Sequence, residues 1–535
     1  MNLMPQMKGT SLYQWLHNLY KIKRLKLDYL KKFFRYLSYP EASQANILIY
    51  AGIGHMYLTH TEILLYHLLK YAGYRVDYYI YDEHIAINEV ITQKVVENGK
   101  KQFWQRSVKN ATKILDAAHV NYSFISKSPE VDVLIAPLKG NYKRLLDFSF
   151  DEIDFGNIVK GVMYRYYKSI NFGDDAAVVA YDFLETSLTN YSQVKTLHEK
   201  NQYKYMLFSH GIYCTWEPVA AYCKQNKIDF VCYDRAKKQG TVNFNINQPA
   251  PDWSFNKAWA RNINRELSVE EEAKVDAYLS ERELQKGDVY SYNPSGKVDD
   301  LSKLKEQLGI KKEARVITLF TNLIWDAANV ARDIAFKSML ECIDKTVEHY
   351  KNKPDVHILV RTHPAEKILG TEIQYAHLIR ERIRSFPDNF TIISGDMEVN
   401  SFTVLDLSDI GVVHTSTVGL EMAMEGNPVL LISETHYRNK GFTFDIEHEV
   451  DYFNTINSLL EKNHLLPQQV KLARKYFYMM MFEYQHKMPV QYKDGIFEKY
   501  CYADFETLRN HVDEPIVQIV EKLTHGNKFD DFFEE

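Results

Sequence analysis

Two series of short apolar runs divide the chain, and a stretch with helical spacing separates most runs from the next. The runs are four to seven residues long and rich in Val, Ile, Leu, Phe and Tyr, which favours buried strands. Strands that alternate with helices form parallel sheets, so the pattern predicts an α/β chain with two Rossmann-like domains and a cleft between them. The predicted strands are Asn46–Tyr50, Arg75–Tyr81, Val131–Ala136, Tyr205–Ser209 and Phe230–Tyr233 in the first series, and Arg315–Phe320, His357–Arg361, Phe390–Ile393, Ile410–Val413 and Val429–Ile432 in the second.

The predicted helices and the polar stretches between them set the expected segments of the chain. Helices are predicted at Thr61–Tyr71, Ala176–Glu199, Asn329–Tyr350, Tyr375–Arg384, Thr417–Glu425 and Asp451–Glu461. A polar, proline-bearing stretch at about 245–300 suggests a helical excursion plus a linker between the domains. We therefore expect a basic helical segment at 1–43, an N-terminal Rossmann-like acceptor domain at 44–300, a C-terminal nucleotide-sugar-binding domain at 301–485 and a helical tail at 486–535.

Charge, cysteine usage and hydropathy exclude several classes of protein. The net charge of -5 gives no excess of positive charge for nucleic acid. Five cysteines without a Cys-x-x-Cys pair indicate reduced thiols rather than a disulfide framework. No apolar run approaches the roughly 20 residues that cross a bilayer, and the N-terminus lacks the features of a signal peptide. We expect a cytoplasmic protein.

The first segment suggests contact with a membrane surface. Basic residues are frequent between Lys21 and Arg35, and Trp15, Leu16, Leu19, Leu30 and Phe33 recur at near-helical spacing. Such a helix at about 8–38 can lie on an anionic membrane, on the cytoplasmic face. The alternative is a helix that packs on its own domain with its lysines in solvent.

Polar clusters follow the strands of the second series, at the edge where parallel sheets bind ligands. Arg361 and His363 follow one strand; a guanidinium can neutralise negative charge, and His363 can donate to a phosphate or nucleotide oxygen. Ser416, Thr417, Gly419 and Glu421 follow another: a capped helix N-terminus with hydroxyl groups suits a phosphate, glycine permits close approach, and the carboxylate can accept from ribose hydroxyls. Two further clusters contain Asn322 with Asp326, and Lys440. Taken singly, each cluster also fits an ordinary turn or helix cap.

The order of these clusters resembles a known family. The motifs TNLIWD, RTHPAE, VHTSTVGLEMAMEGNPVLL and YRNKGFT resemble, over about 310–485, the bacterial capsule polysaccharide biosynthesis family, which includes β-Kdo transferases. The resemblance implies a GT-B-like glycosyltransferase in which His363, Ser416, Thr417 and Glu421 hold the donor nucleotide, with a looser role for Asn322, Asp326 and Lys440. It favours CMP-Kdo or another CMP-linked acidic sugar as donor, and inverting chemistry.

The N-terminal half is expected to supply the general base and the acceptor site. Asp234 stands after a predicted strand, where the family places a carboxylate, although the family's Glu and Gly neighbours are absent. His55, in the turn Gly52-Ile53-Gly54-His55, and Glu62 are the other candidates, and His210 is expected to bind substrate. Each of these residues also fits a turn or a capping position.

No Asp-x-Asp triplet or tight His/Cys/Asp set suggests a metal, so we expect metal-independent transfer without a resident cofactor. The nucleotide sugar is the expected co-substrate, and a glycan or glycolipid of a capsule is the expected acceptor. Three alternatives remain open at this point: a glycerophosphotransferase, a nucleotide-sugar 2-epimerase, and a non-catalytic scaffold in a capsule assembly complex.

Overall fold

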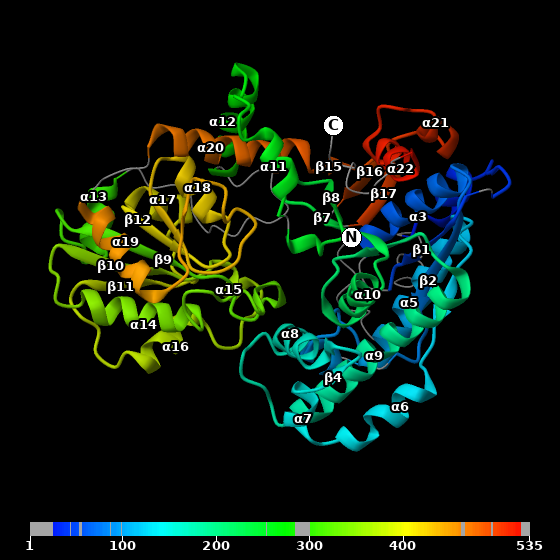
Figure 1. The fold of residues 1–535 in the computed structure, drawn as a ribbon, viewed down its shortest axis with the longest axis horizontal. Helices are drawn as coiled ribbons and strands as arrows, with labels where there is room; N and C mark the ends of the chain where they lie inside the picture. Colours follow the sequence, from blue (N-terminus) through cyan, green and yellow to red (C-terminus); the bar gives the residue numbers. More distant parts are fainter. Residues whose placement is uncertain are drawn as a thin grey trace, which may run out of the picture.

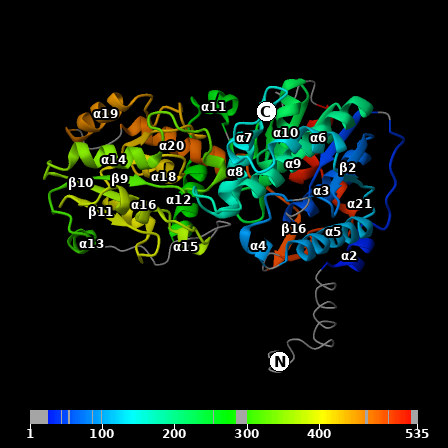
Figure 2. The same ribbon diagram turned by 90° about the horizontal axis from the view of Figure 1, so that it is seen from below.

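Two α/β lobes lie side by side in the computed structural model of the chain (Figure 1). The structure describes residues 25–525 except 43, 53–55, 86, 98, 253, 284–299, 462–465 and 494–495. Each lobe is built on one large sheet with helices on its faces, as expected for a GT-B-like pair of Rossmann-like domains. Turned by 90°, the molecule again shows the two lobes meeting along one side (Figure 2).

The sheet of the first lobe has seven strands in the order β15-β8-β7-β6-β1-β2-β3. Strands β1, β2, β3, β6 and β7 are parallel, whereas β8 and β15 pair antiparallel at one edge. The strand order reverses between β1 and β6, and this is where doubly wound sheets bind ligands. The bounds are β1 Asn46–Tyr50, β2 Arg75–Tyr81, β3 Ser123–Ile125, β6 Tyr205–Ser209, β7 Asp229–Arg235, β8 Thr241–Ile246 and β15 His486–Lys487.

The sheet of the second lobe has six parallel strands in the order β11-β10-β9-β12-β13-β14. Chain order runs outward in both directions from β9 and β12, so the switch point of this sheet lies between these two strands. All five strands predicted for this half are confirmed to within one residue. The bounds are β9 Arg315–Phe320, β10 Val356–Arg361, β11 Phe390–Ile393, β12 Ile410–Val413, β13 Val429–Leu431 and β14 Phe444–Asp445.

Helices of the first lobe surround its sheet. Residues 131–136, predicted as a strand, lie mostly in helix α6, because Pro129 at its first turn and the acids Glu130 and Asp132 favour a helix start. The helices are α3 Met56–Tyr71, α4 Gln93–Glu97, α5 Lys100–Ala117, α6 Pro129–Ile135, α7 Tyr142–Leu146, α8 Phe155–Tyr167, α9 Ala176–Asn201 and α10 Tyr213–Gln225.

Helices of the second lobe follow its strands with one late start. Helix α14 begins at Met339, ten residues after the predicted start, because Ser338 caps it by accepting from the Glu341 N–H. Residues 321–338 are consequently a long connection over the strand ends. The helices are α13 Leu301–Gln307, α14 Met339–Tyr350, α15 Ala365–Ile368, α16 Tyr375–Arg382, α17 Ser401–Leu407, α18 Val418–Met424 and α19 Glu449–Glu461.

Helices α11 (Asn256–Asn262) and α12 (Val269–Glu283) belong to the second lobe. Their residues Trp259, Val275 and Tyr278 are buried in the core that contains β9 and α18. Arg474 of α20 (Pro467–Tyr478) pairs with two acids of α12. The predicted first domain of 44–300 is therefore too long, because the chain crosses to the second lobe near residue 254.

The chain returns to the first lobe after α20. Strand β15 extends the first sheet, and helix α22 (Pro515–His525) packs against α3. Between them lie the hairpin β16 (Val490–Lys493) with β17 (Ile496–Tyr500) and helix α21 (Phe505–Arg509). The prediction of a wholly helical tail at 486–535 is wrong for the hairpin, where Val, Tyr, Ile and Phe favour strands.

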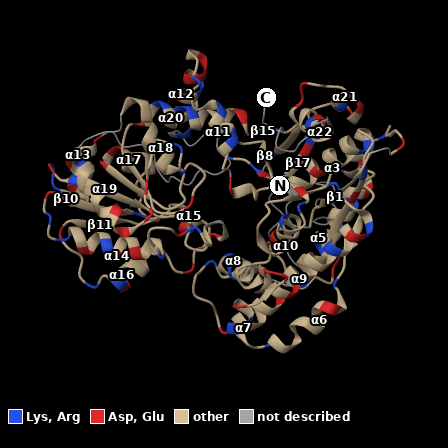
Figure 3. Cartoon of the chain, in the orientation of Figure 1, with Lys and Arg blue, Asp and Glu red and all other residues tan. Residues whose placement is uncertain are grey.

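The described part of the N-terminal segment packs on the protein itself. In helix α2 (Leu27–Phe33), Leu30 and Phe33 are buried, and the ring of Phe33 lies 4.4 Å from that of Tyr500. These two side chains are therefore not available to a membrane, while Trp15, Leu16 and Leu19 lie outside the described residues. Among the helices of the described residues, none combines the length and apolarity that crossing a bilayer requires. Acidic and basic residues are interspersed along the chain in both lobes (Figure 3).

Candidate active site between the two lobes

A hydrogen-bonded set of polar side chains occupies the switch point of the second sheet. Asn322 follows β9 and donates to Thr415 Oγ1 (3.1 Å) and to His414 Nδ1 (3.3 Å), both after β12. The Tyr375 hydroxyl donates to Asn322 Oδ1 over 3.2 Å. The predicted meeting of the Asn322 and Ser416 motifs at one sheet edge is thus present in the structure.

The connection 321–338 adds a second layer to this set. Thr415 donates to Asn329 Oδ1 (2.6 Å), and His414 Nε2 lies 2.9 Å from Asp333 Oδ1. Because His414 Nδ1 accepts from Asn322, the ring donates from Nε2 to Asp333. Asn329 and Asp333 were missed by the sequence reasoning, since they lie in a stretch predicted as helix.

His363 and Arg361 differ in what they face. Burial and the nearby Arg361 lower the pKa of His363 to about 4, so the ring is neutral near pH 7. Nδ1 accepts from the Ala365 N–H (3.1 Å), which leaves the ring proton on Nε2. Arg361 is 2% exposed and donates to the carbonyl oxygens of Ser394 and Val399. The expectation that Arg361 neutralises a ligand is not met, because its guanidinium supports the loop after β11.

The Ser416 motif forms a tight turn into α18. Ser416 Oγ accepts from the Val418 N–H at 3.3 Å, and Ser416 and Thr417 are partly exposed. Gly419, by contrast, is buried: a Cβ added there would lie 2.5 Å from the hydroxyl oxygen of Tyr437. Its role is to admit Tyr437, which donates to the Ser416 carbonyl (2.5 Å), rather than to admit a ligand as predicted.

Glu421 lies one turn further along α18 and is already paired. Arg282, near the end of α12, forms an ion pair with its carboxylate, and the side chain of Glu421 is 9% exposed. A ribose that bound Glu421 would share it with this guanidinium. The sequence does not mark Arg282 as a site residue, because the polar stretch around it is predicted to belong to the other domain.

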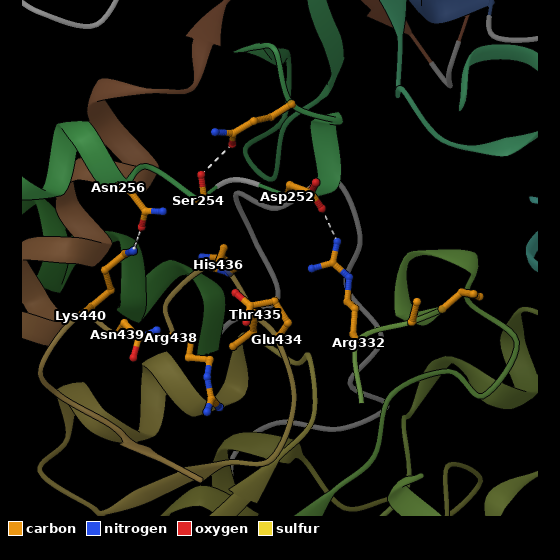
Figure 4. Close-up of a pocket in the computed structure, with 13 residues that line it drawn as sticks. Asp252, Ser254, Asn256, Arg332, Glu434, Thr435, His436, Arg438, Asn439 and Lys440 are labelled. Carbon is orange, nitrogen blue, oxygen red and sulfur yellow. Dashed lines mark hydrogen bonds and ion pairs between the residues drawn. The ribbon is translucent and has the colours of Figure 1, made fainter. Parts of the chain in front are cut away.

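A polar cavity of about 510 Å³ opens between the lobes (Figure 4). Lys440 lines it and donates to Asn256, and burial lowers the pKa of the Lys440 ammonium. Arg332 and Asp252 form an ion pair across the cavity wall. Glu434 and Thr435, directly after β13, complete this side, so the cavity lies at the carboxyl edge of the second sheet.

The switch point of the first sheet holds His210 in a strained turn. His210, Gly211 and Tyr213 all have positive φ, which non-glycine residues rarely adopt. The His210 ring stacks on Trp216, and the Trp216 indole donates to the carbonyl of Tyr50 at the end of β1 (3.2 Å). These contacts fix the imidazole between the ends of β1 and β6.

Asp234 at the end of β7 is the partner of this imidazole. His210 Nε2 lies 3.2 Å from Asp234 Oδ2, and Ser209 Oγ contacts Nδ1. Burial, with Arg165 and Arg235, lowers the pKa of His210 to about 3, so the neutral ring donates to the carboxylate. The Asp234 side chain is 26% exposed. The structure thus brings together two residues that the sequence singled out separately.

Tyr213 marks where the two lobes meet. Its ring lies 5.3 Å from the guanidinium carbon of Arg165. Burial raises the pKa of Tyr213, and Asp326 of the second lobe and Asp234 of the first act in the same direction. Asp326 lies in the connection 321–338, and its backbone carbonyl accepts from the Asn329 N–H over 3.0 Å.

Glu62 lies outside this site. It is 4% exposed and accepts hydrogen bonds from the hydroxyls of Tyr78 (2.7 Å) and Tyr233 (2.8 Å). Burial raises its pKa to about 7. The hypothesis that Glu62 is the base is wrong, because its carboxylate is enclosed within the first lobe. His55 lies outside the described residues.

Comparison with protein families connects this geometry to a known process. Residues 291–462 match the family model of the capsule polysaccharide biosynthesis proteins. The match covers less than half of the chain, and all of it lies in the second half of the sequence. No curated protein matches the chain in sequence.

Distant likenesses to solved structures concern the fold alone. The β-Kdo 2,4 transferase of Thermosulfurimonas dismutans KpsC is 13% identical over 55% of this chain and 84% of that one (TM-score 0.36). The β-Kdo 2,7 transferase of the same protein is 15% identical over 59% and 89% (TM-score 0.33). UDP-GlcNAc 2-epimerase of Neisseria meningitidis is 12% identical over 82% and 100% (TM-score 0.24). Likenesses this distant carry no argument about chemistry.

The second lobe contributes most of the polar groups at the cleft. Within the described residues, no cluster of three or more His, Cys, Asp or Glu side chains is placed to hold a metal ion. Lys440 and Arg332 line the cavity and can offer positive charge to a ligand's phosphate. The His363 ring and the partly exposed hydroxyls of Ser416 and Thr417 are neutral donors, but these three residues are not among those that line the cavity.

Proposed function

We propose that the chain is a glycosyltransferase that moves a sugar from a nucleotide-activated donor to a capsular or other surface polysaccharide. The observation that carries the proposal is the match of residues 291–462 to the capsule biosynthesis family. The polar cavity between the lobes supports it, since the cavity lies beyond the carboxyl ends of strands of the second sheet, where doubly wound sheets bind ligands. A CMP-linked acidic sugar such as CMP-Kdo is the favoured donor.

In this proposal the donor nucleotide binds the second lobe. His363, Ser416 and Thr417 donate to its phosphate, and Glu421 accepts from the ribose hydroxyls. Asn322 holds the loops that carry these groups, and Lys440 offsets charge on the departing phosphate. Preorganised donors in a shielded cleft stabilise a leaving phosphate without a metal ion.

The proposed reaction is an inverting displacement. The oxygen of an acceptor hydroxyl forms a bond to the anomeric carbon of the donor sugar. The bond from that carbon to the phosphate oxygen breaks, and the nucleoside phosphate leaves with the electron pair. A carboxylate of the first lobe takes the hydroxyl proton. Asp234, held by His210, is the base that the sequence predicts.

A donor panel tests the proposal. Thermal shift with CMP, UDP, GDP and CDP identifies the nucleotide, because a ligand that binds the native state raises its apparent stability. Transfer from the matching nucleotide sugars to capsule oligosaccharides then shows the reaction, and NMR of the product gives its anomeric configuration. Turnover of CDP-glycerol, or epimerisation without acceptor, would identify the alternative enzymes instead. Nucleotide binding without turnover would identify a scaffold.

Docking on the inner membrane face remains a proposal for the N-terminal segment. Lys31 and Lys32 of α2 are exposed, as is Arg35 just after the helix, although Leu30 and Phe33 are buried. The apolar contact would have to come from residues before 25. Co-sedimentation with anionic liposomes at low and high salt tests it; absence of binding at low salt contradicts it.

A further inference from the structure

A second, smaller cavity adjoins the one already described. It has a volume of about 170 Å³ and lies between α8 and α10 of the first lobe and the connection 321–338 of the second. Asp252 and Arg332 line both cavities. The ion pair between these two side chains is thus a partition, with the larger cavity on one side and the smaller on the other.

The two compartments suit different ends of a reacting pair. Pockets that enclose a whole small ligand measure about 300–1,000 Å³, a range that includes the larger cavity. The smaller one has room only for the end of a longer molecule. A polysaccharide that presents its terminal sugar there would meet a donor whose departing phosphate lies beside Lys440 in the larger cavity.

Two carboxylates line the smaller cavity: Asp252, which is paired with Arg332, and Glu217. Glu217 lies on α10, four residues after Tyr213, so the two side chains share one face of the helix and both line the space. The strained turn before α10 sets the direction of this face. The same turn holds His210, whose partner Asp234 lines neither of the two cavities.

The surroundings of Glu217 suit a proton acceptor. Burial raises its pKa to about 7, and Asp252 and Asp154 act in the same direction. Lys224 on the same helix opposes them, and Arg332 lines the opposite wall. A base is most effective when its pKa lies near the working pH, because it is then both available and strong.

We propose that the smaller cavity binds the terminal sugar of the acceptor and that Glu217 takes the proton of its attacking hydroxyl. Asp234 is then a positioning residue that acts through His210. This inference rests on the proposed transferase function. The hydroxyl proton moves to Glu217 as the oxygen bonds to the anomeric carbon, and the electron pair of the broken bond leaves with the nucleoside phosphate.

Paired substitutions in the full-length chain test the inference. Glu217→Gln keeps the size of the side chain but removes its basicity, and it should lower turnover about 100-fold or more with nucleotide binding unchanged. Glu199→Gln makes the same change at an exposed position of α9 and should have no effect. Asp234→Asn should reduce turnover by less than Glu217→Gln.

The pH profile separates a catalytic role from a structural one. The kcat/KM of the wild-type chain should fall on the acid side of about pH 7, and the residual activity of Glu217→Gln should lack this limb. Transfer by Glu217→Gln at the wild-type rate, or a larger loss in Asp234→Asn, overturns the inference while the proposed function stands. A wild-type chain without transfer from any donor overturns both.

Discussion

The two lobes present different kinds of surface to the cleft they share. In the second lobe, polar side chains that follow β9 and β12 bond to one another through Asn322 and Thr415. In the first lobe, the corresponding edge consists of a left-handed turn at 210–213 and carboxylates that are buried or paired. The second lobe therefore places its groups by side-chain hydrogen bonds, whereas the first places them by backbone strain and burial.

Because of this difference, we expect the two lobes to be sensitive to different kinds of substitution. A strained backbone tolerates no added atom, but it keeps its geometry when a surface side chain is lost. A hydrogen-bonded set tolerates small backbone shifts but fails when one polar member is removed. Matched substitutions in the two lobes test this difference.

The largest effect is expected for Gly211→Ala. Gly211 has φ +72°, and an added Cβ would lie 2.6 Å from Cys232 Sγ and 2.9 Å from Pro249 Cα. Strain and overlap together should lower the free energy of unfolding by about 3 kcal/mol or more. Urea denaturation measures it. Gly240→Ala is the control, since φ is also positive there, at +76°. Apart from its chain neighbours, no heavy atom of the described residues lies within 4 Å of an added Cβ. Equal losses in the two variants would show that overlap at the turn is unimportant.

Glu62→Gln should change how stability depends on pH. The pKa of Glu62 is raised to about 7 in the folded state, so the stability linked to its protonated form is complete below about pH 4.5 and is lost as pH rises to 7. The loss is at most about 3 kcal/mol. Between pH 4.5 and pH 8, the free energy of unfolding should fall less in Glu62→Gln than in the wild type or in Glu199→Gln. The same fall in all three would show that Glu62 does not titrate there.

His363→Ala and Glu421→Ala test the second lobe. Each should weaken nucleotide binding by about 10- to 100-fold, because a hydrogen bond to a charged group is worth about 1.5–3 kcal/mol. Calorimetry with the nucleotide found by thermal shift measures the affinity. Glu425→Ala, at the exposed end of α18, is the control. Wild-type affinity in both variants would show that the nucleotide does not bind at this edge of the second sheet.

The smallest effect is expected for the pair between the lobes. Arg332 and Asp252 retain 17% and 37% side-chain exposure, so their coupling should be about 1 kcal/mol or less and should weaken with salt. A double-mutant cycle with Arg332→Ala and Asp252→Ala measures it by thermal unfolding. A coupling free energy of several kcal/mol between Arg332 and Asp252 would mean that this ion pair also holds the two lobes together.

The same contrast explains how much could be predicted from the sequence. In the second lobe, β9, β10 and β12 are apolar runs followed directly by polar motifs, so these strands and the approach of Asn322 to the Ser416 motif were predictable. Glu217, Asp252 and Arg332 meet only in the folded chain, and no local pattern marks them. Glu62 illustrates the opposite error, since nothing in the sequence shows that Tyr78, 16 residues away, and Tyr233, 171 residues away, both bond to its carboxylate.

The chain passes between the lobes twice, near residue 254 and again between α20 and β15. Gln485 anchors the second passage by accepting from the Lys238 N–H over 2.7 Å. Two lobes joined at two points rotate most easily about the line through those points, which acts as a hinge axis. Both passages lie on the side of α11 and β15, whereas α8 and α15 face each other across the gap (Figure 1). The contacts of Lys168 with Leu369 and Glu372 on that far side are the ones such a rotation would part first.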